Sequence, residues 1–250
     1  MFGANTVSSL YDAALAVAYP QICAVCEGSV ESRFEGVACA GCWEETRLIV
    51  VEDRLCWKCG ALGLAGIAEE RREAVRCHRC DDAAFTAARA CGLYQGALRA
   101  AVIELKRAPH VPKRLLQLLQ ETSRRSPLDR FTLMVPVPLH PQREKERGFN
   151  QAAVLARALS RRTGRPVAEN CLVRLEHTER HRAGMDAQAR RESVENAFGL
   201  VTPRTIAGES ILLIDDVFTT GATISACAVV LQTAGAKEVL ALTLARPLDG

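Results

Sequence analysis

Four Cys-x-x-Cys pairs lie between Cys23 and Cys80 of this 250-residue chain, and they constrain its fold more than any other feature. A Cys-x-x-Cys turn places two thiolates side by side, and a second such turn completes a tetrahedral Zn–S4 site. A disulfide framework would need an oxidising compartment, and a redox Cys-x-x-Cys normally occurs once, near a βαβ unit. We therefore expect two structural zinc ions, bound by the thiolates of Cys23, Cys26, Cys39, Cys42, Cys56, Cys59, Cys77 and Cys80.

The order of the pairs leaves two ways of sharing the thiolates between two zinc ions. A sequential arrangement gives two zinc ribbons, one from the first two pairs and one from the last two. A cross-braced arrangement joins the first pair with the third and the second with the fourth. The short spacer from Trp43 to Leu55 favours the sequential arrangement. Four thiolates fill each site in either case, so we expect His78 to be a bystander and neither site to hold a catalytic water.

The overall composition is that of an ordinary globular protein. Hydrophobic residues make up 48% of the chain, the net charge is +3 and the mean hydropathy is +0.02. No apolar run reaches the roughly 18 residues that a membrane span needs. The first residues have no Lys or Arg before their apolar stretch, which argues against a secretory signal and favours a short amphipathic helix over residues 1–20. We therefore expect a cytoplasmic protein with no membrane span.

The charges divide the chain into an acidic and a basic part. Residues 1–88 carry 8 basic and 13 acidic residues, whereas residues 89–250 carry 24 basic and 16 acidic ones. Residues 99–192 alone hold 20 basic and 10 acidic residues. Such an excess indicates an anionic partner, such as phosphate or nucleic acid, although a solvated Arg-rich surface has the same composition. We expect a double zinc ribbon over 21–86, after the helix over 1–20, and a larger domain over 87–250.

The larger domain alternates strand-like and helix-like runs. This alternation predicts an α/β domain with a mainly parallel sheet, whose ligands lie beyond the carboxyl ends of the strands. Helical spacing runs from Arg99 to Leu119 and is interrupted around Pro109 and Pro112. Further helices are expected after Asn150, stopped by Gly164, and over 223–234, stopped by Gly235; strands are expected over 131–137, 171–175, 210–214 and 238–244.

Residues 211–223 carry the clearest functional pattern, Ile-Leu-Leu-Ile-Asp-Asp-Val-Phe-Thr-Thr-Gly-Ala-Thr. Four apolar residues predict a buried strand that ends in two carboxylates. The small residues that follow lead into a helix, where backbone N–H groups, hydroxyls and the helix dipole can bind phosphate. Asp215 and Asp216 cannot also bind phosphate, so they must contact another part of the same ligand, either vicinal hydroxyls or a magnesium ion.

This run resembles the phosphoribosyl pyrophosphate (PRPP) signature of type I phosphoribosyltransferases. The resemblance implies that Asp215 and Asp216 contact the ribose hydroxyls of PRPP. It also implies that the 5-phosphate, with magnesium bound to PRPP, is held beside Thr219, Thr220, Gly221, Ala222 and Thr223.

Further motifs are similar to those of the ComF family. They are Val135-Pro-Val-Pro-Leu-His-Pro with Arg143, Arg147-Gly-Phe-Asn-Gln151, Tyr94-x-Gly-x-Leu-Arg99 with Leu105-Lys106, and the double zinc ribbon. This resemblance covers nearly the whole chain and makes residues 87–250 a type I phosphoribosyltransferase-like domain. ComF proteins are associated with DNA uptake during natural transformation, and many are labelled amidophosphoribosyltransferases by similarity.

The resemblance also bears on catalysis. Pyrophosphate that leaves the anomeric carbon gains negative charge, so magnesium and cationic side chains must stabilise it. Arg143 and Arg147, with Lys145 between them, follow the strand end where the family binds pyrophosphate. The closing loop of type I enzymes corresponds to 174–198, where Thr178 matches the family and His181 departs from it, so ligand binding is a firmer expectation than turnover.

Three functions are compatible with these features. The first is a PRPP-binding factor in DNA uptake, the second an active phosphoribosyltransferase of nucleotide or amine metabolism, and the third a PRPP-sensing regulator without turnover. Zinc ribbons are compatible with binding of single-stranded DNA and with other DNA-uptake proteins as partners, but Trp43 and Trp57 are the evident stacking residues and can instead cover the zinc sites. The sequence identifies no pocket for a phosphoribosyl acceptor.

Overall fold

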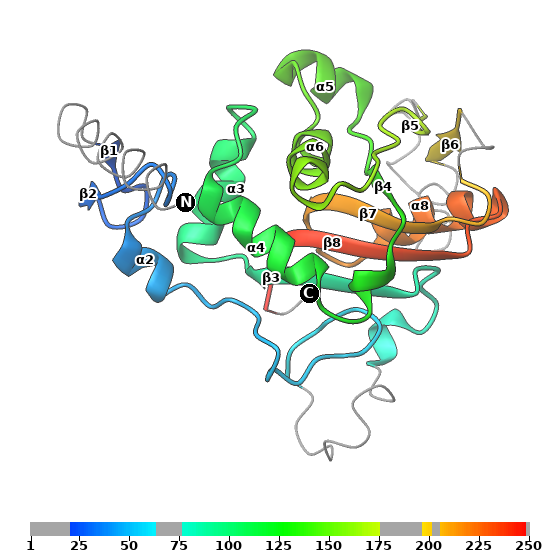
Figure 1. The fold of residues 1–250 in the computed structure, drawn as a ribbon, viewed down its shortest axis with the longest axis horizontal. Helices are drawn as coiled ribbons and strands as arrows, with labels where there is room; N and C mark the ends of the chain where they lie inside the picture. Colours follow the sequence, from blue (N-terminus) through cyan, green and yellow to red (C-terminus); the bar gives the residue numbers. More distant parts are fainter. Residues whose placement is uncertain (1–20, 64–76, 176–196, 202–205, 249–250) are drawn as a thin grey trace, which may run out of the picture.

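The computed structural model describes residues 21–63, 77–175, 197–201 and 206–248. The helix expected over 1–20 lies outside these residues, as does most of the expected closing loop, including Thr178 and His181. The described residues form an α/β fold around a four-stranded parallel sheet, which confirms the fold class expected from the sequence (Figure 1). The cysteine-rich segments lie beside this sheet, at the left and at the bottom of Figure 1.

The sheet has the strand order β3-β8-β7-β4, and all its strands are parallel. Its strands are β3 (Ala87–Leu93), β4 (Leu133–Pro136), β7 (Ser210–Val217) and β8 (Glu238–Arg246). The continuous apolar runs in β7 and β8 suit central strands that are buried on both faces. In the register of the sheet, Ile214 of β7 lies opposite both Pro136 of β4 and Leu242 of β8. The carboxyl ends of the strands therefore meet at one edge.

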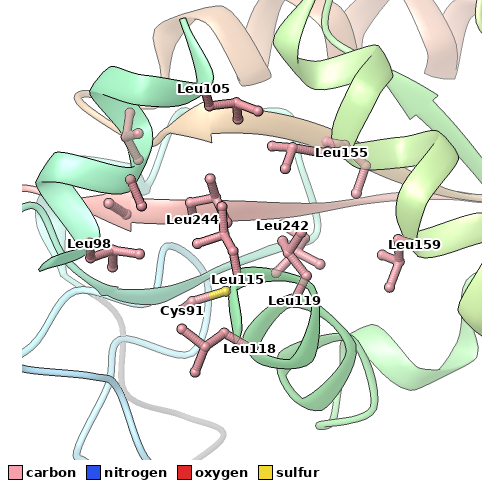
Figure 2. Close-up of a cluster of buried hydrophobic side chains, with 14 of the residues drawn as sticks. Cys91, Leu98, Leu105, Leu115, Leu118, Leu119, Leu155, Leu159, Leu242 and Leu244 are labelled. Atoms are coloured by element: carbon pink, nitrogen blue, oxygen red, sulfur yellow. The ribbon is translucent and has the colours of Figure 1, made fainter. Parts of the chain in front are cut away.

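Side chains from successive strand residues enter two separate cores, one on each face of the sheet. On one face Leu212, Ile214 and Leu242 pack against three helices, and Figure 2 shows this leucine-rich cluster. On the other face Ile211 and Leu213 pack against α8. The helices are α3 (Gly96–Leu105), α4 (Lys113–Ser123) and α6 (Gln151–Thr163) on the first face and α8 (Ala222–Thr233) on the second.

The ends of the helices follow from particular residues. The Asn150 side chain accepts a hydrogen bond from the N–H of Ala152 at 2.9 Å and begins α6, and Gly164 in the left-handed region ends it, as expected. The segment between α3 and α4 contains Pro109 and Pro112, which explains the interruption expected there. In the described part of the chain, no helix is long and apolar enough to cross a membrane.

Shorter elements complete the described fold. They are β1 (Gln21–Ile22) and β2 (Ser29–Val30), α2 (Ala40–Glu44), the 3-10 helices η2 (His78–Cys80) and η3 (Leu128–Arg130), α5 (Pro141–Arg147), and β5 (Leu172–Arg174) with β6 (Phe198–Leu200). β1 pairs with β2 and β5 pairs with β6, both antiparallel. The cysteines outside the Cys-x-x-Cys pairs, Cys91, Cys171 and Cys227, are buried in the two cores as small apolar side chains.

The chain between the second and third Cys-x-x-Cys pairs covers the outer edge of β3. Leu48 forms an antiparallel bridge with Gly92, and the N–H of Ile49 donates to the carbonyl of Cys91 at 2.9 Å. Further along, the N–H of Ala88 donates to the carbonyl of Lys58 at 2.7 Å. An exposed strand edge is a template for pairing with another chain, so this covering protects the sheet as well as anchoring the cysteine-rich segments.

Candidate functional site

The eight paired cysteines form two tetrads, in the sequential arrangement. The first tetrad is Cys23, Cys26, Cys39 and Cys42, the second is Cys56, Cys59, Cys77 and Cys80, and the sulfur atoms of each tetrad all lie within 4.8 Å of one another. Closest pairs are 3.7 Å apart in the first tetrad and 3.4–3.5 Å apart in the second. Zn–S bonds of about 2.3 Å in a tetrahedron require S–S separations of about 3.8 Å. The thiols are therefore grouped as a zinc ion needs them.

Backbone N–H groups point at one sulfur of each tetrad. The Sγ of Cys23 accepts from the N–H groups of Val25 and Cys39 at 3.4 and 3.3 Å, and the Sγ of Cys56 accepts from that of Cys77 at 3.3 Å. Burial raises the pKa of the Cys23 thiol, but hydrogen bonds outweigh it and lower that pKa to about 6. A hydrogen bond from the Cys59 thiol, with further ones, lowers the pKa of Cys56 to about 4.

In each tetrad, the pKa of another thiol is raised by its surroundings. Burial, together with the neighbouring sulfurs, raises the pKa of Cys80 to about 12 and moves that of Cys42 upward as well. Four thiolates close together repel one another, and a divalent ion removes that repulsion. The donor set of each tetrad therefore fits zinc, and all four positions come from protein, which makes both sites structural.

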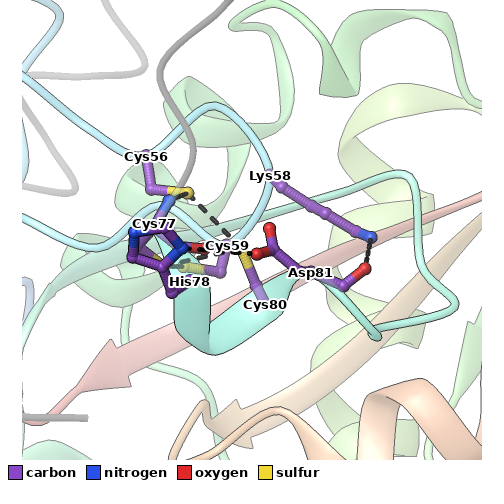
Figure 3. Close-up of polar contacts among 7 residues, drawn as sticks. All are labelled: Cys56, Lys58, Cys59, Cys77, His78, Cys80 and Asp81. Atoms are coloured by element: carbon purple, nitrogen blue, oxygen red, sulfur yellow. Dashed lines mark hydrogen bonds and ion pairs between the residues drawn. The ribbon is translucent and has the colours of Figure 1, made fainter.

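Side chains around the second tetrad take no part in binding a metal (Figure 3). His78 is exposed, and its Nδ1 lies 3.6 Å from a carboxylate oxygen of Asp81, as expected for a bystander. Lys58 donates from Nζ to the carbonyl of Asp81 at 3.2 Å, which ties the two cysteine turns together. In the first tetrad, the buried Trp43 donates from its indole nitrogen to the carbonyl of Glu35 at 2.8 Å, so this ring covers the site and is not free to stack with a base.

A second candidate site lies where β7 ends. Asp215 and Asp216 are the sixth and seventh residues of β7, and both are partly buried. The N–H of Asp216 donates to Oδ1 of Asp215 at 2.8 Å, and Nζ of Lys106 lies 3.3 Å from Oδ2 of Asp216. Burial and the adjacent Asp216 raise the pKa of Asp215 to about 8, against the opposing effect of Lys106. Asp215 can therefore hold a proton near neutral pH.

The residues after the aspartates form a turn into α8, and we call residues 215–223 the carboxylate loop. Gly221 is in the left-handed region with φ 79° and directly precedes α8, and Oγ1 of Thr220 accepts from the N–H of Ala222 at 3.3 Å. The first N–H groups of a helix have no acceptor within it, and they carry the positive end of the helix dipole. Thr219 and Thr220 are exposed beside them. The loop thus offers N–H and hydroxyl donors to an anion, next to a pair of carboxylates.

The two arginines expected at this edge lie on α5. The chain leaves β4 beside β7, because the N–H of Val137 donates to the carbonyl of Ile214 at 2.9 Å. His140 then caps α5 by accepting from the N–H of Gln142 at 3.2 Å. Within the described residues, the side chains of Arg143 and Arg147 make no hydrogen bond or ion pair, so both guanidinium groups are available to an anion. The structure does not bring them into contact with the aspartates.

Two residues of this region make contacts that the sequence did not predict. Lys106 follows α3 and pairs with Asp216, and its only sequence signal was its place in the Leu105-Lys106 motif. Arg246 ends the apolar run of β8 and is 2% exposed, and a charge at the end of such a run is a weak signal. Both act through contacts between segments far apart in the chain, which the sequence analysis did not anticipate.

Comparisons with known proteins bear on the family. The model of a phosphoribosyl transferase domain matches residues 145–250, which include the carboxylate loop. The chain is 36% identical over 135 residues to competence protein F of Haemophilus influenzae and 34% identical over 119 residues to competence protein ComFC of Bacillus subtilis. It is 34% identical over 115 residues to the DNA utilization protein YhgH of Escherichia coli O157:H7. The chain is therefore similar to ComF-family proteins.

The chain spans about half the length of the curated relatives it matches. The alignments cover 53%, 47% and 46% of this chain and 58%, 46% and 49% of the three relatives. Among solved structures, a glutamine PRPP amidotransferase from B. subtilis, complexed with ADP and GMP, aligns with a TM-score of 0.39 and 16% identity. That alignment covers 57% of this chain and 30% of the amidotransferase.

Proposed function

We propose that this chain binds PRPP together with magnesium at the carboxylate loop and acts in DNA uptake during natural transformation. The observation that carries the proposal is the arrangement at the end of β7. Asp216 and Asp215, whose pKa is raised, lie beside a helix N-terminus that is reached through Gly221. A ligand that carries both a vicinal diol and a phosphate satisfies both halves of this arrangement.

We assign the different groups of PRPP to different residues at the carboxyl ends of the strands. The 5-phosphate is assigned to the N–H groups and hydroxyls of residues 219–223, where the dipole of α8 favours a dianion. The ribose diol is assigned to Asp215 and Asp216, whose oxygens can accept hydrogen bonds, and a protonated Asp215 can also donate one. Lys106 holds Asp216 in place from the other side. Arg143 and Arg147 are assigned to the pyrophosphate, because their guanidinium groups are unpaired within the described structure.

Turnover would use the same residues. Magnesium, when bound with PRPP, supplies positive charge to the departing pyrophosphate. Arg143 and Arg147 add to that charge, and the aspartates stabilise the positive charge that develops on the ribose. The chain's own residues thus serve either an active phosphoribosyltransferase or a sensor that binds PRPP without turnover. A role in DNA uptake is compatible with both.

The names of the relatives support the cellular role. Two are named competence proteins and one a DNA utilization protein. Direct contact with single-stranded DNA would rest on the basic stretch of sequence over 99–192, because Trp43 is buried. Phosphate contacts give affinity that falls steeply with salt concentration, so titration with an oligonucleotide at increasing salt tests this part of the proposal.

Calorimetry with PRPP and magnesium tests the ligand. We expect wild-type protein to bind PRPP and the double variant Asp215→Asn, Asp216→Asn to lose at least tenfold in affinity, since a hydrogen bond to a charged group contributes about 1.5–3 kcal/mol. Pyrophosphate and ribose 5-phosphate, titrated separately, show which half of the ligand each group binds. Equal PRPP affinity in the double variant contradicts the assignment. A screen for pyrophosphate release over bases and amines then separates the transferase from the sensor.

A further inference from the structure

The carboxylate loop is joined to the second tetrad by a buried arginine. Arg246, the last residue of β8, is 2% exposed. One guanidinium nitrogen donates to the carbonyl of Cys59 at 2.6 Å. The guanidinium carbon lies 5.3 Å from the ring centroid of Phe218, within the carboxylate loop. One planar group thus contacts both a cysteine turn of the tetrad and an aromatic ring of the loop.

The other cysteine turn of the second tetrad reaches the same ring. Shortly after Cys80, the Phe85 ring meets the Phe218 ring edge to face, with centroids 5.9 Å apart and planes at 86°. The neighbouring Ala84 is fixed to α8, because its N–H donates to Oγ of Ser225 at 2.9 Å and its carbonyl accepts from Gln232 at 2.8 Å. Both halves of the tetrad therefore converge on Phe218.

Phe218 in turn sets the place of Gly221. A Cβ at Gly221 would lie 2.7 Å from Cζ of Phe218 and 3.3 Å from Cε1 of Phe85. The backbone of the turn therefore lies directly against these two rings. The N–H of Phe218 also donates to the carbonyl of Ala245 at 2.9 Å, which ties the loop to the strand that carries Arg246. A shift of the Phe218 ring must move the turn that begins α8.

We propose that Arg246 is a positioning residue that couples the second tetrad to the carboxylate loop. The intact tetrad holds the Cys59 carbonyl, that carbonyl orients the guanidinium group, and the guanidinium group with Phe85 fixes Phe218 beneath Gly221. Loss of the tetrad's geometry therefore loosens the loop. The effect on PRPP affinity rests on the proposed function, whereas the coupling itself does not.

Hydrogen exchange of the ligand-free full-length protein tests the coupling without any ligand. In Arg246→Met we expect amides of residues 217–224 to exchange about tenfold faster than in wild type, since the bond lost is one from a charged donor. Arg125→Met is the matched control, because Arg125 also donates to a backbone carbonyl of the cysteine-rich half, that of Ile49 at 2.7 Å, but interacts with Cys91 of the opposite core. Arg246→Lys keeps the charge and should restore part of the protection.

The dependence of zinc binding on PRPP is a second measurement, and it would not change with Arg246 if this residue only stabilised the fold. Coupling is reciprocal, so saturating PRPP should raise the affinity for zinc, measured by equilibrium competition with a chelator, in wild type but not in Arg246→Met. If Arg246→Met does not fold, Phe85→Leu breaks the second route and should loosen the same amides. Unchanged exchange in both variants overturns the proposal even where PRPP binds. If wild type fails to bind PRPP, the proposed function is lost, and the exchange data still decide on the coupling.

Discussion

Lys106 lies with its Nζ 3.3 Å from Oδ2 of Asp216, so the end of α3 is tied to the end of the central strand β7. The lysine side chain is 39% exposed and the aspartate side chain 19%, so solvent screens the pair and limits its contribution to stability. Its importance lies in the charge balance of the site. Lys106 opposes the rise in the pKa of Asp215 that burial and Asp216 cause.

The raised pKa of Asp215 predicts a pH dependence of stability in the ligand-free protein. The folded pKa is about 8 and the unfolded one about 3.9, so between these values the folded state binds more protons. The free energy of unfolding therefore falls as pH rises through this window, and the loss is complete above about pH 8. We expect Asp215→Asn to remove this dependence while keeping the Oδ1 that accepts the N–H of Asp216.

Denaturant unfolding between pH 6 and 9 measures this effect, since lower pH protonates zinc-bound thiolates. Above pH 8, Asp215→Asn should be more stable than wild type by at least about 1.4 kcal/mol, the equivalent of one pKa unit. Asp129→Asn, at an exposed carboxylate, is the control and should follow the wild-type curve. A wild-type stability that stays level from pH 6 to 9 would contradict the environment described for Asp215.

Removal of one zinc ligand at a time should separate the two tetrads. The protein should hold about two zinc ions, and Cys39→Ser and Cys59→Ser should each hold about one. We expect Cys39→Ser to unfold the first tetrad while the α/β domain persists. Cys59→Ser should lower the unfolding temperature of the whole protein, because the Cys59 carbonyl accepts a hydrogen bond from the buried Arg246 of the central strand β8.

Elemental analysis and thermal unfolding followed by circular dichroism check both variants. Zinc-free protein from a fresh, reduced preparation would rule out the metal sites. Equal loss of the α/β transition in both variants would show that the two cysteine-rich segments are equally part of one core. Retention of that transition in both would show that the double zinc ribbon over 21–86 is a separate folding unit.

The covered edge of β3 can be tested at one glycine. A Cβ at Gly92 would lie 2.8 Å from the carbonyl oxygen of Arg47 and 2.9 Å from Cδ2 of Leu98. Gly92→Ala must therefore push the covering segment away from the strand, and we expect a loss of about 1–3 kcal/mol in the free energy of unfolding. Gly41→Ala, in α2 with no atom within 4 Å of its Cβ, should be neutral or slightly stabilising. Equal stability of the two variants would contradict a tight edge contact.

Local patterns predicted much of this fold. The apolar run before Asp215 identified β7, Asn150 identified the start of α6, and the Cys-x-x-Cys spacing favoured the arrangement of the tetrads that the structure has. β3 was missed because its Ala-rich sequence has little strand propensity, and it forms because β8 pairs with one side and the cysteine-rich segment with the other.

The contacts of the site were less predictable than its loop. The carboxylates and the glycine of residues 215–223 form a contiguous pattern that can be read directly. The partners Lys106 and Arg246 come from other segments, and which of the many basic residues reaches the loop depends on strand order and register. Such tertiary pairings have no local signal in one sequence.

The turn into α8 gives the sharpest test of the proposed anion site. Gly221 has φ 79°, and a Cβ there would lie 2.7 Å from Cζ of Phe218. Gly164 has a similar φ of 71° at the end of α6, with no atom within 4 Å of an added Cβ. Alanine at either position carries the same left-handed strain of about 1–2 kcal/mol, but only Gly221→Ala also displaces Phe218.

We therefore expect Gly164→Ala to lose stability and keep its affinity for PRPP, whereas Gly221→Ala should lose at least tenfold in affinity. Calorimetry with PRPP and magnesium, beside denaturant unfolding of the same samples, separates strain from ligand contact. The N–H groups at the start of α8 must keep their direction to hold a phosphate, and a moved Phe218 ring turns them away. If both variants bound PRPP equally well, the phosphate would have to be held elsewhere than at residues 219–223.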